Sequence, residues 1–261
     1  MILEKIAKAT AERVAKQKKI RPLLVLRQEA EQLPKGNFTF GTALAGSGMH
    51  FICEVKKASP SKGLIAPNFP YLAIAKAYEA AGASALSVLT EPQFFLGSNK
   101  YLTEIKQKIA IPVLRKDFIL EPYQIYEAKV IGADAILLIA ALLSLEQLRD
   151  YQALAAELGL SCLVEAHDEQ EVAKALKAQA AIIGVNNRNL KDFTVDISNS
   201  SKLRKLVPAD IIFVSESGMR TRADIAALEA AKVNAVLVGE TLMRSGNIAA
   251  TLAELRGLKH D

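Results

Sequence analysis

The chain has no tryptophan, only two cysteines, and no apolar run long enough to cross a bilayer. Cys53 and Cys162 both fall inside apolar runs, so we expect buried thiols, and no metal-ligand spacing is present. The longest apolar run covers residues 135–145, which is too short for a transmembrane helix. Residues 1–19 carry helical charge periodicity instead of the apolar core of a signal peptide. We therefore predict a soluble cytoplasmic protein with no membrane partner and no metal.

A strong excess of charge of one sign is also missing. The net charge is +5 over 261 residues, and the densest basic segment, residues 16–21, has no interleaved aromatic side chains. Such a segment is more typical of a solvated helix end than of a nucleic-acid surface, so no nucleic-acid partner is expected. A mildly positive field nevertheless suits a small anionic substrate.

What the chain does have is a repeated pattern in which a short aliphatic strand ends in a polar turn and a helical segment follows. The eight predicted strands are residues 50–56, 84–90, 111–116, 134–140, 160–166, 181–187, 210–216 and 234–240. Predicted helices between them include residues 71–82, 122–132, 145–159, 168–178 and 221–231. Gly82, Gly132 and Gly159 stand where helices would end in left-handed caps.

Strand-then-helix units imply parallel strands, because parallel neighbours need a crossover connection. Eight units close a (β/α)8 TIM barrel. An open doubly wound sheet is the alternative, but its glycine-rich loop should follow the first strand, whereas residues 41–48 precede it. We therefore predict an α/β protein with one barrel domain over residues 1–261, in which residues 1–47 form an N-terminal helical extension.

Ionisable and amide side chains stand at the ends of five strands, on the face that is apolar further down. In "FICEVKKASPSKG", for example, Glu54 and Lys56 share the face of Ile52. Such residues can simply mark where a strand reaches water. Yet inward-facing strand ends of a barrel meet at its C-terminal mouth, where a desolvated charge cluster indicates catalysis. The candidate catalytic residues are Glu54, Lys56, Lys116, Glu165, Asn186 and Glu216, together with Ser217, which follows Glu216 directly.

The loops after the seventh and eighth strands, "SESGMRT" and "VGETLMRSGN", are where barrels often bind phosphate. Gly218 and Gly239 would allow backbone N–H groups to approach an anion, and "SPSKG" after the first strand adds hydroxyls and a lysine. Glu240 would repel a phosphate unless its side chain turns away and only its amide serves. Phe95 and Phe118, after the second and third strands, are candidates for walling a flat aromatic substrate, although aromatic side chains can also just anchor loops.

With these residues assembled, the chain resembles the indole-3-glycerol phosphate synthase family from "MILEKI" almost to its end. The motifs that carry the resemblance are "CEVKKASPSKG", "SVLTEPQFFLGS", "LRKDFILEPYQIYEA", "LVEAHDEQE", "IGVNNRNL", "VSESGM" and "LVGETLM". The resemblance implies a carboxy-lyase of tryptophan biosynthesis that closes the indole ring by condensation, decarboxylation and dehydration. Its substrate would be a small phosphorylated molecule, with no cofactor, and association with other enzymes of that pathway is a further implication.

The resemblance also implies residue roles. Lys116 would be the general acid, Glu165 the base, and Lys56, held by Glu54, would steer the substrate carboxylate. Asn186 and Glu216 would orient hydroxyls and the neighbouring ammonium groups, with Arg188 near the anthranilate carboxylate. The phosphate site would consist of Ser59, Ser217, Gly218, Gly239 and the amide of Glu240.

Two other functions fit parts of the pattern. A phosphoribosyl isomerase would use an acid–base pair, usually aspartate or cysteine, at the ends of opposite strands, where this chain has Glu54, Lys56 and Asn186. A non-catalytic barrel that binds a sugar phosphate or a partner enzyme would not need Lys116 or Glu165.

Overall fold

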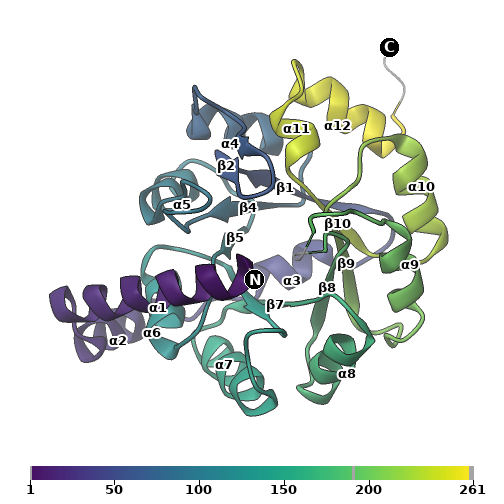
Figure 1. Cartoon of the computed structure of the whole chain (residues 1–261). Coiled ribbons are helices and arrows are strands. Elements are labelled where there is room, and N and C mark those ends of the chain that lie inside the picture. The colour runs from purple at the N-terminus through teal and green to yellow at the C-terminus, as the bar shows by residue number, and fades with distance from the viewer. Residues whose placement is uncertain (1, 190–191, 259–261) are drawn as a thin grey trace.

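The computed structural model describes residues 2–189 and 192–258, and eight parallel strands form a closed barrel in it. The strands neighbour one another around the barrel in the order β1, β4, β5, β6, β7, β8, β9, β10, and β10 closes onto β1 (Figure 1). They span His50–Val55 (β1), Ala85–Leu89 (β4), Val113–Lys116 (β5), Ala135–Ile139 (β6), Ser161–Ala166 (β7), Ile182–Asn186 (β8), Ile212–Glu216 (β9) and Ala235–Val238 (β10). The predicted barrel and all eight predicted strands are confirmed.

Helices surround the barrel and supply the crossover after each strand (Figure 1). They are Tyr71–Ala80 (α4), Asn99–Lys106 (α5), Pro122–Val130 (α6), Leu145–Glu157 (α7), Glu169–Lys177 (α8), Ser198–Arg204 (α9), Arg222–Ala230 (α10), Glu240–Met243 (α11) and Ile248–Arg256 (α12). The five predicted helices are all present. The predicted left-handed caps are confirmed too, since Gly82, Gly132 and Gly159 have φ of 87°, 90° and 73°.

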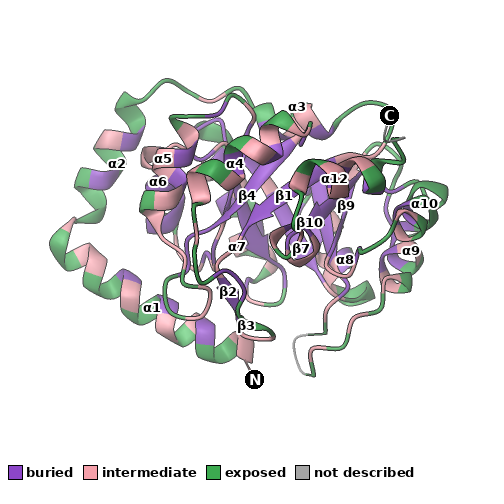
Figure 2. Ribbon diagram, turned by 90° about the horizontal axis from the view of Figure 1, so that it is seen from above, coloured by how far each residue is buried: buried purple, intermediate pink, exposed green. Residues whose placement is uncertain are grey.

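Alternation along the strands divides their side chains between two apolar layers. Ile52 and Leu114 belong to a small cluster inside the barrel, whereas Phe51, Cys53 and Val55 belong to the larger layer between strands and helices (Figure 2). The inward and outward faces predicted for the first strand are therefore confirmed. Both cysteines are free, but Cys162 is only partly buried, because it faces the outer layer near the start of β7.

Three helices precede the barrel: α1 (Ile2–Ile20), α2 (Leu23–Gln32) and α3 (Thr39–Leu44). The first two pack beside α6, and the start of α1 reaches over the barrel mouth (Figure 1). The third closes the opposite end, where Phe40 and Leu44 join the interior cluster and the Gly41 amide donates to Ser161 Oγ at 3.2 Å (Figure 2). The helical extension thus covers both ends of the barrel.

The loop after β1, which the sequence suggested only as a turn, contains a small hairpin. Its strands are β2 (Ala58–Ser59) and β3 (Gly63–Leu64), paired antiparallel. Gly63 has a φ of 62°, a conformation that glycine adopts without steric cost. The hairpin holds Ser59 and Ser61 at the rim of the mouth, with their hydroxyls 3.5 Å apart.

Candidate active site

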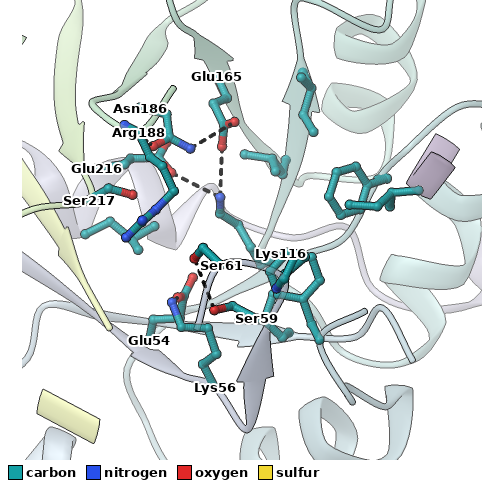
Figure 3. Close-up of a pocket in the computed structure, with 18 of the residues that line it drawn as sticks. Glu54, Lys56, Ser59, Ser61, Lys116, Glu165, Asn186, Arg188, Glu216 and Ser217 are labelled. Atoms are coloured by element: carbon teal, nitrogen blue, oxygen red, sulfur yellow. Dashed lines mark hydrogen bonds and ion pairs between the residues drawn. The ribbon is translucent and has the colours of Figure 1, made fainter. Parts of the chain in front are cut away.

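The carboxyl ends of the strands enclose a pocket whose walls come from all eight barrel strands or the loops after them. Every candidate site residue predicted from the sequence lines this pocket except Gly218 and Gly239, which line an adjoining one. Figure 3 shows the labelled side chains converging on one space from opposite sides. The shared mouth predicted for these residues is therefore present.

Lys116 lies at the centre of the charged group. Its Nζ donates to Glu165 Oε2 at 2.9 Å and to Glu216 Oε2 at 3.0 Å (Figure 3). The side chains are 14%, 4% and 2% exposed, so the ion pairs are nearly dry. Burial alone would lower the pKa of Lys116, but the charges of Glu165, Glu216 and Glu54 outweigh it and raise that pKa above its ordinary value. The ammonium form is therefore strongly favoured.

The two carboxylates that share Lys116 differ in their proton affinity. Burial would raise the pKa of Glu165, but Lys116, His167 and a 3.4 Å hydrogen bond from Asn186 Nδ2 lower it below its usual range. Burial raises the pKa of Glu216 to about 7, with a further contribution from the charge of Glu165 that Lys116 only partly offsets. Near neutral pH the site therefore holds one firmly ionised carboxylate and one that exchanges its proton.

Glu216 reaches Lys116 because Gly184 leaves room for it. A Cβ at position 184 would overlap Glu216 Oε1 and lie 3.1 Å from Leu163 Cδ1. Glu216 Oε1 is buried and makes no hydrogen bond within the described residues. The glycine in "IIGVN" is thus required by the carboxylate of the neighbouring strand.

Lys56 and Glu54 form a second ion pair, at the β1 side of the mouth. Lys56 Nζ donates to Glu54 Oε1 at 2.5 Å, and Ser87 Oγ donates to Glu54 Oε2 at 3.3 Å. Burial would raise the pKa of Glu54, but the two lysines, Lys56 and Lys116, lower it. A Cβ on Gly239 would lie 2.7 Å from Glu54 Oε1 and 3.0 Å from Lys56 Nζ, so this glycine makes space for the pair.

Apolar side chains form one wall of the pocket and the roof that α1 places over it. The rings of Phe95 and Phe118 have centroids 6.0 Å apart at an interplanar angle of 37°. Ile2, Leu3 and Ile6 of α1 line the same pocket. A helical extension was predicted for residues 1–47, but these three residues were not identified, because their spacing alone also fits an ordinary packed helix.

The adjoining pocket lies between the loops after β9 and β10 and is lined by Ser217, Gly218 and Gly239. Ser217 and Gly218 have consecutive positive φ values of 68° and 100°. The turn is held by Asn187 Nδ2, which donates to the Ser217 carbonyl oxygen at 3.0 Å. A Cβ on Gly218 would lie 2.6 Å from Val195 Cγ1, so packing requires glycine there as well. Asn187 was not among the predicted site residues, because the strand period places Asn186 on the inward face with Gly184 and its neighbour on the outward one.

Arg188 and Glu240 stand where the two pockets meet. Arg188 Nη2 lies 3.9 Å from Glu240 Oε2, and Lys62 Nζ lies 3.5 Å from Glu240 Oε1. Arg244 Nε donates to the same Oε1 at 3.2 Å. The expected conflict between the Glu240 carboxylate and an anion is thus moderated by three nearby cations.

A buried charge network behind the pocket was missed by the sequence analysis. Arg115 is fully buried, pairs with Glu127, and donates to Asp117 Oδ2 at 3.1 Å. Asp117 Oδ1 also accepts from Arg13 Nη2 of α1 at 2.9 Å and from the Phe118 amide at 2.8 Å. The network therefore joins the N-terminal arm to the loop that carries Phe118. The sequence feature that could have revealed this network is Arg115, which lies on the outward face of "VLRK", where an apolar residue is expected.

Among residues 2–189 and 192–258, no group of three or more metal-binding side chains is close enough to hold an ion. Over the same residues, no helix is long and apolar enough to span a membrane.

Comparison with known proteins identifies the relationship. A family model described as indole-3-glycerol phosphate synthase matches residues 3–255. The chain is 60% identical over 258 residues to an indole-3-glycerol phosphate synthase of Ruminiclostridium cellulolyticum, covering 98% of this chain and 99% of that one. It is also 60% identical to the Endomicrobium trichonymphae protein of the same name, over 98% of this chain and all of the other. The chain belongs to the indole-3-glycerol phosphate synthase family.

Family membership confirms the resemblance and the enzyme class predicted from the sequence, a carboxy-lyase of tryptophan biosynthesis. Solved structures with the same fold are far more distant. The 3-hexulose-6-phosphate synthase from Salmonella typhimurium has a TM-score of 0.66 at 13% identity, over 80% of this chain and 97% of that one. At that identity the likeness supports only the barrel fold.

Proposed function

We propose that this chain converts 1-(2-carboxyphenylamino)-1-deoxyribulose 5-phosphate into indole-3-glycerol phosphate, with loss of one CO2 and one water. The observation that carries the proposal is Lys116 Nζ, held between Glu165 and Glu216 on the floor of a nearly dry pocket with an aromatic wall. Ring closure needs such a combination, because a proton must reach the substrate ketone oxygen while a flat anthranilate ring approaches the ketone carbon.

Lys116 is the general acid in this proposal. Its pKa is raised by the surrounding carboxylates, so it stays protonated until a more basic atom develops beside it. The ketone oxygen becomes that atom as the ring carbon attacks. Glu165 and Glu216 fix the ammonium in position, which lowers the entropic cost of the transfer.

Lys56 and Arg188 steer the anthranilate carboxylate until it departs as CO2. Both side chains line the pocket, and Glu54 holds Lys56 at 2.5 Å. Phe95 and Phe118 supply an apolar wall for the anthranilate ring. The carboxylate departs as CO2 because the electron pair of the broken C–C bond neutralises the cationic ring that the attack has formed, and an apolar wall favours this loss of charge.

Glu165 is the general base of the final dehydration, in which a ring proton leaves after the hydroxyl departs as water. Its lowered pKa keeps it ionised and ready to accept that proton. Asn186 orients the Glu165 carboxylate through their 3.4 Å hydrogen bond, and Glu216 orients Lys116. Both are also available to substrate hydroxyls, because they line the pocket.

The substrate phosphate would bind in the adjoining pocket, against Ser59, Ser217, Gly218, Gly239 and the Glu240 amide. Support comes from Gly218 and Gly239, which leave the backbone uncovered in this pocket, and from Arg188 and Arg220 in its lining. A structure with bound product tests this assignment: phosphate bound by the lysines of α1 instead would refute it.

The function itself is tested by incubating the pure protein with the carboxyphenylamino substrate and following indole fluorescence. A rise at catalytic protein concentration is expected. Absence of product with intact substrate binding would favour the non-catalytic barrel, and formation of an isomerised sugar phosphate would favour the isomerase. We also propose that residues 1–261 form one domain, that the protein acts in the cytoplasm, and that it associates with other enzymes of the pathway.

A further inference from the structure

One titratable side chain beside the proposed base has no role in the scheme above. His167 follows β7 directly, and its Nε2 lies 3.5 Å from Glu165 Oε1. That nitrogen is buried and has no hydrogen-bond partner within the described residues. The other ring nitrogen, Nδ1, lies 3.1 Å from Glu171 Oε2 of α8.

The contacts of His167 fix which nitrogen carries the first proton. Glu171 Oε2 already accepts the His167 backbone N–H at 2.8 Å, and an ionised carboxylate can only accept, so Nδ1 is the donor. In the neutral ring, Nε2 then presents a lone pair to Glu165 Oε1. The Asn199 side chain donates to the His167 carbonyl oxygen at 3.1 Å and holds the backbone of the same turn.

His167 also connects two environments. Glu165 belongs to the floor of the mouth, whereas His167, Asp168, Glu171 and Asp196 line a side cavity that adjoins the mouth at Asn186 and Arg188. The charged groups that act on the ring are Glu165 of β7, Glu171 of α8 and Glu216 of β9. Burial lowers the pKa of His167, but these carboxylates outweigh burial and raise it, which favours the imidazolium form.

The proposed reaction needs a supply of protons. One proton goes to the ketone oxygen and a second to the departing hydroxyl, while one returns from the ring carbon to the base. Because CO2 leaves from an ionised carboxylate, each turnover consumes one net proton. Glu165 and Lys116 are in direct contact and can exchange the returned proton, but the net proton has to come from water while substrate covers the mouth.

We propose that His167 relays this proton from the side cavity to Glu165, which passes it on to Lys116. In each cycle the imidazolium transfers its Nε2 proton to Glu165 Oε1, and the Glu165 proton moves to the neutral Lys116 amine. The ring then rotates about Cβ–Cγ so that Nε2 meets the side cavity, where it takes a proton from a hydronium ion and leaves water. No bond other than N–H and O–H bonds forms or breaks. The inference rests on the proposed function, and it adds a residue to which the ring-closure scheme gives no part.

The His167→Asn substitution tests whether His167 relays a proton or only supports the loop. The asparagine amide can still donate to Glu171 in place of Nδ1–H, but it has nothing in place of Nε2. We expect kcat to fall about tenfold or more, within the range of general acid–base contributions, with KM nearly unchanged and a larger solvent deuterium isotope effect on kcat. In His167→Ala, added imidazole should restore part of kcat. His50→Asn is the matched control. His50 begins β1, at the end of the strand that lies away from the mouth, so this substitution should leave kcat unchanged.

A kcat for His167→Asn within twofold of the unmodified protein would overturn the relay. A loss of kcat that imidazole does not restore and that leaves the isotope effect unchanged would also overturn it, since it would show that the side chain only supports the loop. Failure of the proposed function is distinguishable, because the unmodified protein itself would then form no indole product.

Discussion

Replacement of Lys116 by methionine tests the centre of the proposed mechanism. Methionine keeps an unbranched apolar stem of similar length and removes only the ammonium group, so the fold of β5 should be preserved. The variant loses the proton donor. It also loses the cation that lies 2.9 Å from Glu165 and 3.0 Å from Glu216.

The size of the effect follows from both losses. A positioned general acid contributes about 10² to 10⁴ in rate. In addition, Lys116 is the largest influence that lowers the pKa of Glu165 against burial, so without it that pKa rises and a smaller share of the carboxylate is free to accept a proton. We therefore expect kcat to fall by at least about 10³-fold, which corresponds to about 4 kcal/mol in the barrier. The dissociation constant of substrate should change only a few-fold, since the aromatic wall and the phosphate pocket remain.

The assay combines indole fluorescence for turnover with calorimetry for substrate binding. Lys106→Met is a matched control: Lys106 Nζ also makes a close ion pair, 2.6 Å from Asp134 Oδ2, but outside the mouth, and its loss should leave kcat within about twofold. Turnover of Lys116→Met within tenfold of the unmodified protein would refute the general-acid assignment. Equal losses in both variants would mean that the effect comes from stability.

Three further outcomes are expected. Gly184→Ala should lower kcat about 10²-fold with little change in KM, because the new Cβ displaces the Glu216 carboxylate from Lys116; kinetics like the unmodified protein would contradict the close contact. Glu216→Gln should be more stable than the unmodified protein above pH 7, by up to about 3 kcal/mol. The folded-state pKa of Glu216 is raised from 4.5 to about 7, so the native state holds its proton longer than the unfolded chain, and stability is lost as pH rises through that window. Denaturant titrations of both proteins at pH 4 and pH 8 measure this, and a difference that does not change with pH would contradict it. A single domain predicts one cooperative unfolding transition by fluorescence and circular dichroism alike, whereas two separate transitions would show that residues 1–47 unfold independently.

The strands and their two faces were predictable because each strand follows a simple period of two and ends in a turn. Once eight parallel strands close, the inward ends of β1, β5, β7, β8 and β9 must meet, so Lys116 and Glu165 could be placed in one mouth without coordinates. Their hydrogen-bond partners could not. Which carboxylates hold Lys116 depends on side-chain reach across the barrel, whereas the Glu54–Lys56 pair was expected from the family resemblance.

Residues that act from outside the strand pattern were missed. Ile2, Leu3 and Ile6 complete the roof only because α1 crosses the mouth, and a helix carries no sequence signal for the place where it docks. Arg115 faces outward from β5, where the period predicts an apolar residue. His167 stands in a turn, where polar residues are expected. For α1 the decisive contacts join segments far apart in the chain, as the Arg13–Asp117 ion pair shows.

Gly184 and Gly239 are needed in the structure for a reason that the sequence did not indicate. From the sequence, Gly239 was predicted to allow a phosphate to approach the backbone. In the structure, a side chain there would strike the Glu54–Lys56 pair, just as one at position 184 would strike Glu216. A barrel interior of this width is normally filled by aliphatic layers, and here the top layer holds three glutamates and two lysines instead. Long charged side chains fit only if neighbouring strands give up volume, so glycines at the strand ends are a requirement of the charge cluster itself, whether or not an anion also binds against Gly239.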